Sequence, residues 1–282
     1  VAGARVVLLV GPGNNGGDTL YAGAHLARRG AAVTAVLAAE RVHDEGLAAV
    51  RAAGGRVVPA ASGAAAGVDV ATGADVVLDG LLGIGGRGGV RGRAAELVTA
   101  LAAARPRPFV VAVDVPSGIG VDDGTLPPAP VLPADLVVTF GGAKPGLLLP
   151  PAAGIVGRVE VVDVGLALPP DEAVVGRLGN DDIAAVWPVP RADDHKYSRG
   201  VLGVVAGTAA YPGAAVLVTG AAVRAGVGMV RYLGEPGAAV VAAHPEVVVA
   251  EGQVQAWALG SGVDAHDEAQ AARIAAALRS GL

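Results

Sequence analysis

The feature that most constrains the fold of this chain is a short apolar run that breaks into a glycine-rich turn. Val6 to Val10 contain only valine and leucine, as expected for a parallel strand buried on both faces, and Gly11-Pro-Gly-Asn-Asn-Gly-Gly-Asp18 follows directly. Thr19 to Arg29 then carry a helix-like pattern. A turn at this position combines free backbone N–H groups with the positive end of a helix dipole, so the stretch predicts an anion or phosphate site.

Strand-like and helix-like patterns alternate from Val1 to about Pro170. This alternation predicts an α/β fold with a doubly wound, Rossmann-like parallel sheet. In such a sheet, ligands bind at the carboxyl ends of the strands, near a switch in strand order. The expected strands are 5–10, 32–37, 56–58, 74–78, 108–113, 136–140 and 157–162, and the expected helices are 18–29, 43–53 and 93–104.

Polar residues stand just after several of these strands. Asp79 follows one strand and precedes the loop Gly83 to Gly89, which has five glycines in seven residues. Asp114 follows the expected strand 108–113, and Lys144 lies in the loop after the expected strand 136–140. Each could be an ordinary strand-end turn, but together they predict one crevice, in which Asp114 and Lys144 are available for proton transfer.

A second group of residues could ligate a cation. Asn15, Asp79 and Ser117 offer hard oxygen atoms, which suit a group I or II ion better than zinc or copper. The five histidines show no paired spacing and cysteine is absent, so thiol nucleophiles, disulfides, iron–sulfur clusters and a zinc site have no candidate ligands.

Composition narrows the class of partner. The formal charge is −5 with no basic run, so no nucleic acid or anionic membrane is expected as a partner. No stretch of about 18 apolar residues predicts a membrane span. We therefore expect a cytoplasmic protein that acts on a small polar or anionic metabolite.

Three other interpretations of the first motif remain open. Gly11, Gly13 and Gly16 match GxGxxG and Glu40 ends the next strand-like run, which would indicate a Rossmann oxidoreductase. However, an unpaired Asp18 carboxylate would repel a pyrophosphate docked there, so another group must compensate its charge. The motif could also be an ordinary turn, or part of a non-catalytic dinucleotide-binding or interaction module, which would not need Asp114 and Lys144.

Four motifs in order resemble those of NAD(P)H-hydrate epimerase, the YjeF N-terminal family. They are Val10-Gly-Pro-Gly-Asn-Asn-Gly-Gly-Asp18, Leu78-Asp-Gly-Leu-Leu-Gly83, Ala112-Val-Asp-Val-Pro-Ser-Gly118 and Phe140-Gly-Gly-Ala-Lys-Pro-Gly146. The resemblance implies an epimerase domain over residues 1–168 without its N-terminal helices. Its activity would interconvert the R and S epimers of NADHX and NADPHX, the forms of NADH and NADPH hydrated at C6 of the nicotinamide ring.

The resemblance also implies roles for individual residues. Asn15, Asp79 and Ser117 would bind a potassium ion, and Asp114 would contact the substrate. We assign proton transfer to Asp114, with Lys144 as its partner. The residues that would hold the hydrated dinucleotide are Asn14, Asn15, Gly16, Gly17, Asp18, Gly83, Ile84, Gly85, Gly86, Arg87, Gly88 and Gly89. Thr19 departs from the family pattern, as does the glycine-rich stretch 86–89.

The rest of the chain changes character. Residues 169–194 predict a linker with a short helix at 180–185, and residues 195–282 resemble the opening of an ADP-dependent NAD(P)H-hydrate dehydratase. The resemblance implies an incomplete ribokinase-like α/β unit, with strands at 201–206, 229–233 and 255–259 and helices at 214–225 and 264–279. Ala214 and Gly262 would lie near its substrate.

The Gly-Thr-Gly-Asp type of turn that the dehydratase family uses is missing from residues 195–282. We therefore expect a chain truncated at both ends, in which this stretch alone does not dehydrate the hydrate, and in which ADP would serve only the complete domain. A homo-oligomer is also expected.

Overall fold

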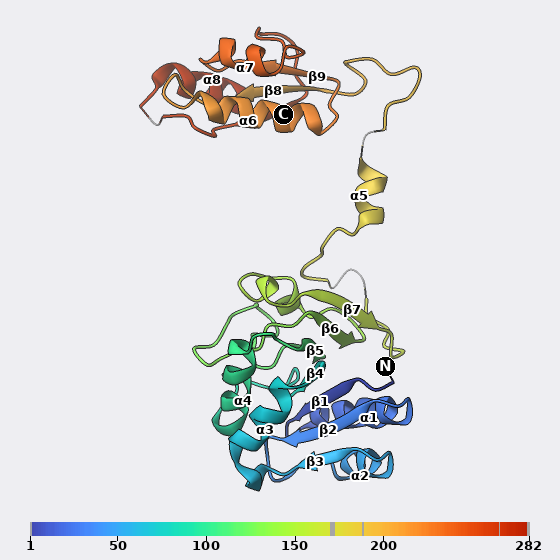
Figure 1. The fold of residues 1–282 in the computed structure, drawn as a ribbon. Coiled ribbons are helices and arrows are strands. Elements are labelled where there is room, and N and C mark those ends of the chain that lie inside the picture. The colour runs from blue at the N-terminus through green and yellow to red at the C-terminus, as the bar shows by residue number, and fades with distance from the viewer. Residues whose placement is uncertain (1, 170–172, 188, 265, 281–282) are drawn as a thin grey trace. The chain divides into compact units, whose positions relative to one another are not determined.

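The computed structural model describes residues 2–169, 173–187, 189–264 and 266–280 of the 282-residue chain. The chain divides into two compact units, Val1–Arg177 and Leu178–Leu282 (Figure 1). Parts of the predicted linker, at 170–172 and 188, and residue 265 of the last predicted helix lie outside the described residues. Within the described residues, no helix has both the length and the apolarity needed to cross a membrane.

The first unit is built on a seven-stranded sheet in which every neighbouring pair is parallel. The strand order is β3-β2-β1-β4-β5-β6-β7, so the direction of winding reverses between β1 and β4. The doubly wound, Rossmann-like prediction is therefore confirmed. The strands are β1 (Arg5–Val10), β2 (Ala32–Leu37), β3 (Arg56–Val58), β4 (Val76–Gly80), β5 (Phe109–Val113), β6 (Leu136–Phe140) and β7 (Arg158–Val162).

Helices cover both faces of this sheet. Helices α1 (Asn14–Arg28) and α2 (Asp44–Ala52) lie on one face, and α3 (Gly63–Thr72) and α4 (Gly92–Ala103) lie on the other (Figure 1). Because side chains alternate along a strand, β1 supplies both cores. Val6, Leu8 and Val10 belong to the buried cluster that includes residues of α1 and α2.

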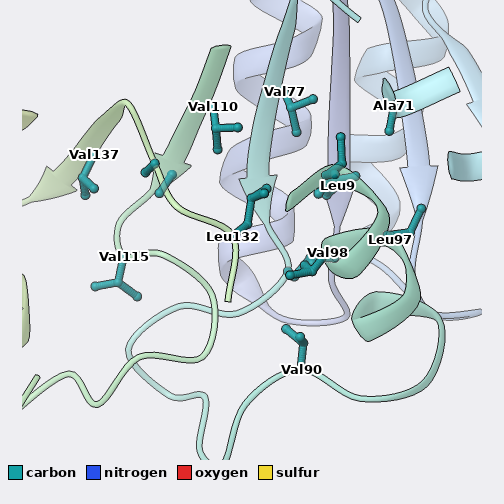
Figure 2. Packing of buried hydrophobic residues seen from close by; sticks show 14 of the residues in the cluster. Leu9, Ala71, Val77, Val90, Leu97, Val98, Val110, Val115, Leu132 and Val137 are labelled. Carbon is teal, nitrogen blue, oxygen red and sulfur yellow. The ribbon is translucent and has the colours of Figure 1, made fainter. Parts of the chain in front are cut away.

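Val7 and Leu9 of β1 belong to the opposite cluster. Figure 2 shows Leu9 among Leu97 and Val98 of α4, with Val77 of β4 and Val110 of β5 nearby. The central strands are thus buried on both faces, which explains why their sequences read as continuous apolar runs. Their carboxyl ends are the part of the sheet left free for a site.

The predicted start of the first helix was wrong. Helix α1 begins at Asn14, not Asp18, so the Asn-Asn-Gly-Gly stretch forms its first turn instead of a loop before it. Close packing explains the difference, because a Cβ on Gly16 would lie 2.2 Å from the carbonyl oxygen of Gly11. Strand β4 also extends through Gly80, which places Asp79 inside the strand.

Helix α3, which is rich in alanine and glycine, was not predicted, since its sequence lacks a clear polar and apolar alternation. In the second unit, helix α7 was also missed. Helix α8 begins at Glu268, four residues later than expected, because the side chain of Asp267 caps it by accepting a hydrogen bond from the backbone N–H of Gln270 at 3.0 Å.

The second unit holds a smaller, three-stranded parallel sheet in the order β10-β8-β9. Its core joins Val204, Val230 and Tyr232 of the sheet to Ala215 and Val240 of the helices. This confirms a second α/β arrangement. Its elements are α5 (Asn180–Val186), β8 (Val201–Val205), α6 (Pro212–Arg224), β9 (Met229–Tyr232), α7 (Gly237–Ala243), β10 (Ala256–Leu259) and α8 (Glu268–Arg279).

The close approach of the ends of β1 and β4 leads to a stability prediction. A methyl group on Gly11 would lie 1.9 Å from the carbonyl oxygen of Leu81, so Gly11→Ala must displace the backbone. We expect a loss of about 1–3 kcal/mol in the free energy of unfolding, measured by urea denaturation. Gly154→Ala is the control, because a methyl group there meets nothing within 4 Å. Equal midpoints for the two variants would contradict the prediction.

Candidate functional site

The carboxylate of Asp79 is fully buried at the carboxyl end of β4. Its Oδ1 accepts a hydrogen bond from the Ser117 hydroxyl at 2.6 Å, and its Oδ2 accepts one from the Ser117 backbone N–H at 2.9 Å. Burial raises the pKa of Asp79, while the bonds from Ser117 and from the backbone N–H of Leu81 act in the opposite direction. No basic side chain forms a salt bridge with Asp79 within the described residues. A buried carboxylate in these surroundings favours the binding of a small cation beside it.

The backbone of Leu82 connects Asn15 to the hydrogen-bonded pair Asp79 and Ser117. The Asn15 side-chain amide donates to the Leu82 carbonyl at 3.1 Å, and the Leu82 backbone N–H donates to the Ser117 hydroxyl at 2.8 Å. Asn15 comes from the first turn of α1, Asp79 from β4 and Ser117 from the loop after β5. The structure therefore brings together the three residues predicted as ligands of a potassium ion.

Asp114 follows β5 and has an unusual backbone. Its φ is 70°, and it is the only non-glycine residue with a positive φ among those the structure describes. Asparagine and aspartate tolerate this region better than most residues, but it is still sparsely populated. Such strain is typical of functional positions.

Lys144 reaches the Asp114 carboxylate from the loop after β6. Its ammonium group donates to Asp114 Oδ1 at 2.6 Å, to the Thr139 hydroxyl at 2.8 Å and to the carbonyl of Phe140 at 2.9 Å. Both side chains are largely buried, with 16% of Lys144 and 11% of Asp114 exposed. The ammonium group is therefore fixed on one oxygen of the carboxylate.

A cleft of about 530 Å³ lies above these groups, at the switch between β1 and β4. Of the predicted substrate residues, it is lined by Asn14, Asn15, Asp18, Gly83, Ile84, Gly85, Gly86 and Asp114. Pro12, Gly13, Leu81 and Leu82 also line it; they lie within the quoted motifs but were not among the predicted substrate residues.

The remaining predicted substrate residues of the first unit do not line this cleft. Gly16 and Gly17 are buried, and a Cβ on Gly17 would lie 2.9 Å from the ring of His43. These two glycines are needed for packing. Arg87, Gly88 and Gly89 line neighbouring hollows instead.

Asp18 brings a second carboxylate into the cleft. Partial burial raises its pKa, the negative charge of Asp114 adds to this shift, and His43 opposes it. His43 is held at the start of α2, where its Nδ1 accepts a hydrogen bond from the Gly46 backbone N–H at 3.1 Å.

Comparison with known proteins places this geometry in a family. The family model described as YjeF-related protein N-terminus matches residues 1–146, about half of the chain. A protein named NAD(P)H-hydrate epimerase from Clavibacter michiganensis is 46% identical over 56% of this chain and 72% of its own length. The chain belongs to this epimerase family.

Longer relatives carry both parts of the chain. Proteins named bifunctional NAD(P)H-hydrate repair enzyme are 48% identical in Mycobacterium tuberculosis, over 100% of this chain, and 47% identical in Mycobacterium leprae, over 96%. The chain spans 57% and 55% of their respective lengths. A model described as NAD(P)H-hydrate dehydratase matches residues 202–280. The resemblance inferred from the motifs, to the epimerase and to part of the dehydratase, is thus confirmed.

In the dehydratase-like unit, the two predicted substrate residues are neighbours. A Cβ on Gly262 would lie 2.5 Å from the Cβ of Ala214, and the φ of Gly262 is +68°. Ala214 lies in the first turn of α6, and Gly262 follows β10. The residues therefore meet at one end of the smaller sheet.

Sequence reasoning missed two parts of this candidate site. Thr139 is fully buried, and its hydroxyl donates to Asp114 Oδ1 at 3.1 Å. A polar residue inside the apolar strand 136–140 was the available signal. The backbone N–H and carbonyl of Leu82 also organise the site, but no sequence pattern marks a backbone group.

The raised pKa of Asp18 can be tested by NMR titration of its carboxyl carbon. The folded protein holds the Asp18 proton more tightly than the unfolded chain does. The stabilising contribution of Asp18 is therefore complete below the usual carboxyl pKa and is lost as the pH rises through the raised pKa of the folded state. The advantage of the wild type over Asp18→Asn in unfolding free energy should therefore shrink as the pH rises. Asp114→Asn should lower the Asp18 pKa, since it removes the neighbouring negative charge.

Asp75 provides a control of opposite sign. Its hydrogen bonds and ion pair with Arg5 lower its pKa to about 2, so its stabilising contribution is present above the usual carboxyl pKa and is lost as the pH falls toward 2. The advantage of the wild type over Asp75→Asn should therefore shrink on acidification. The same trend for both variants would refute the assignment for Asp18.

Proposed function

We propose that the first unit epimerises NADHX and NADPHX at the hydrated C6 carbon of the nicotinamide ring. The observation that carries this proposal is the Asp114 carboxylate, which lines a cleft at the switch point of the sheet and is held by Lys144. The family relationship supports the same reaction. NADHX and NADPHX themselves are inferred as substrates from the names of the relatives.

In this proposal, Asp114 moves the proton at the C6 hydroxyl. Inversion of this carbon requires either loss of the hydroxyl or opening of the bond from C6 to the ring nitrogen, and each route moves a proton on or off an oxygen. Lys144 and Thr139 bond to Oδ1 of the carboxylate, and Oδ2 forms no hydrogen bond with the described residues. Oδ2 is thus the oxygen assigned to proton transfer, and Lys144 positions the carboxylate.

The substrate would lie across the first turn of α1. Free N–H groups at Asn14 and Asn15 can donate to the pyrophosphate, and the glycines of the 83–86 loop allow the backbone to approach closely. Gly16 and Gly17 would act indirectly, by permitting this turn. Arg87, Gly88 and Gly89 would contact parts of the dinucleotide outside the main cleft.

We also propose a potassium site at Asn15, Asp79 and Ser117. The buried carboxylate of Asp79, without a basic side chain to balance it in the described part of the chain, together with nearby amide, hydroxyl and carbonyl oxygens, fits a hard monovalent cation. Such an ion, when bound, would supply positive charge beside the pyrophosphate-binding turn.

The second unit would contribute to dehydration in the longer proteins, with ADP as the cofactor of the complete domain. Ala214 and Gly262 would then lie beside the hydrate. Homo-oligomer formation and a cytoplasmic location stay predictions.

Two alternative functions require different residues at the site. An oxidoreductase would place an acidic residue on the ribose, but Glu40 is exposed and lines none of the three main hollows. A non-catalytic dinucleotide-binding module would not depend on Asp114, so mutation of Asp114 separates it from the epimerase.

We expect Asp114→Asn to reduce the rate of epimerisation by about 10² to 10⁴ fold, because an amide keeps the shape of the side chain but cannot accept the proton. The assay follows separated R and S NADPHX by chromatography or NMR. Affinity for NADPHX, measured by isothermal titration calorimetry, should change much less than the rate.

Asp69→Asn is the matched control, since Asp69 is exposed on α3 away from the cleft. Its rate should equal that of the wild type. An unchanged rate for Asp114→Asn would reject the assignment and favour the non-catalytic module. Equal losses of affinity and rate would make Asp114 a binding residue.

The cation site predicts a dependence on potassium that can be measured without substrate. Potassium chloride should raise the melting temperature relative to the same concentration of tetramethylammonium chloride, because an ion that binds only the folded state stabilises it by about 2.7 kcal/mol at 100 times its Kd. Asp79→Asn should abolish this increase, whereas Asp75→Asn, at an exposed ion pair, should retain it. Equal melting temperatures of the wild type in the two salts would refute the site.

A further inference from the structure

A second hollow of about 320 Å³ lies on the other side of the β1 and β4 ends. Ala38 and Ala39 after β2, Leu81 after β4, and Val90 and Ala94 near the start of α4 give it an apolar wall. It shares Pro12, Leu81 and Leu82 with the cleft that contains Asp114, so the two hollows adjoin. A long ligand in the cleft can extend into this second hollow.

Two arginines give the hollow a positive charge. Arg87 and Arg91 both line it, and both are exposed. Neither forms a salt bridge or a side-chain hydrogen bond with any residue that the structure describes, and no acidic residue is part of the lining. Gly88 leaves room for the side chain of Arg91 beside this loop, since a Cβ on Gly88 would lie 3.2 Å from Nη2 of Arg91. The guanidinium groups are therefore available to an anion.

The third hollow of the first unit has a different character. It is about 350 Å³ in volume and adjoins the cleft at Ile84 and Gly86. Arg87 lines this hollow as well, but Arg91 does not, and the lining includes Asp122 and Asp123. The negative charges of these two carboxylates repel a phosphate group. Of the two extensions of the cleft, the apolar hollow with the arginines is thus the better match for an aromatic ring that carries a phosphate.

We propose that this second hollow binds the adenosine half of the substrate, and that Arg87 and Arg91 recognise the 2′-phosphate that distinguishes NADPHX from NADHX. The inference rests on the proposed epimerase function, which requires a dinucleotide in the cleft. In dinucleotide-binding folds, a carboxylate after the second strand selects the free ribose hydroxyl, whereas a nearby arginine accommodates the 2′-phosphate. Here Glu40 lies outside the lining and the arginines lie in it, so the first unit prefers NADPHX.

The experiment measures binding to the whole chain by isothermal titration calorimetry. Adenosine 2′,5′-bisphosphate should bind at least about tenfold more tightly than AMP, because each hydrogen bond to a charged group contributes a factor of this order. Arg87→Ala and Arg91→Ala should each reduce this preference, and the double variant should remove it. Arg51→Ala, at the exposed end of α2, is the control for loss of one positive charge and should keep the preference.

A kinetic readout connects the hollow to the reaction. The ratio of kcat/KM for NADPHX to that for NADHX should fall in the arginine variants, mainly through a higher KM for NADPHX. Circular dichroism and melting temperature establish that each variant is folded. Equal binding of the two adenosine ligands to the wild type, or a preference that survives the double substitution, would overturn the proposal.

Failure of the two proposals can be told apart. If the chain does not epimerise either hydrate but still prefers the bisphosphate through Arg87 and Arg91, the hollow is a nucleotide site and the proposed reaction is wrong. If epimerisation proceeds equally on both hydrates and the bisphosphate has no advantage, the reaction stands and the adenosine site falls.

Discussion

The two hydrogen bonds from Ser117 to the buried carboxylate of Asp79 hold the site together. They join the end of β4 to the loop after β5, and the Ser117 hydroxyl also fixes the backbone of Leu82. Asn15 then attaches the first turn of α1 to the same backbone. The wall of the cleft therefore depends on one carboxylate that burial makes difficult to ionise and that its neighbours keep hydrogen-bonded.

Glycine residues make this arrangement possible, because the end of β1, the start of α1 and the end of β4 lie too close together to leave room for a Cβ atom. Gly11 lies against the Leu81 carbonyl, Gly16 against the Gly11 carbonyl, and Gly80 against the side chain of Thr19. Larger residues would push α1 away from β4 and open the cleft. Thr19 is fully buried, and its hydroxyl donates a hydrogen bond to the Asn15 carbonyl at 2.8 Å.

The sequence allowed the sheet and most of the site to be predicted because apolar runs mark where the strands end. Asp79, Ser117, Asp114 and Lys144 follow from this rule, since parallel strands present their carboxyl ends at one edge. The start of α1 did not follow, because two asparagines and two glycines are poor helix formers and tertiary packing outweighs their propensity. Thr139 was overlooked because threonine is also a common strand residue.

The positive φ of Asp114 has a consequence for protein engineering. A glycine at this position would remove a conformational strain of the order of 1–3 kcal/mol, although it would also leave the Lys144 ammonium without its carboxylate. Replacement of Asp114 would therefore change the stability of the protein in two opposing ways. Libraries screened only for solubility or heat resistance would sample replacements of the residue assigned to proton transfer, and stabilised variants should be sequenced at this position before they are used as catalysts.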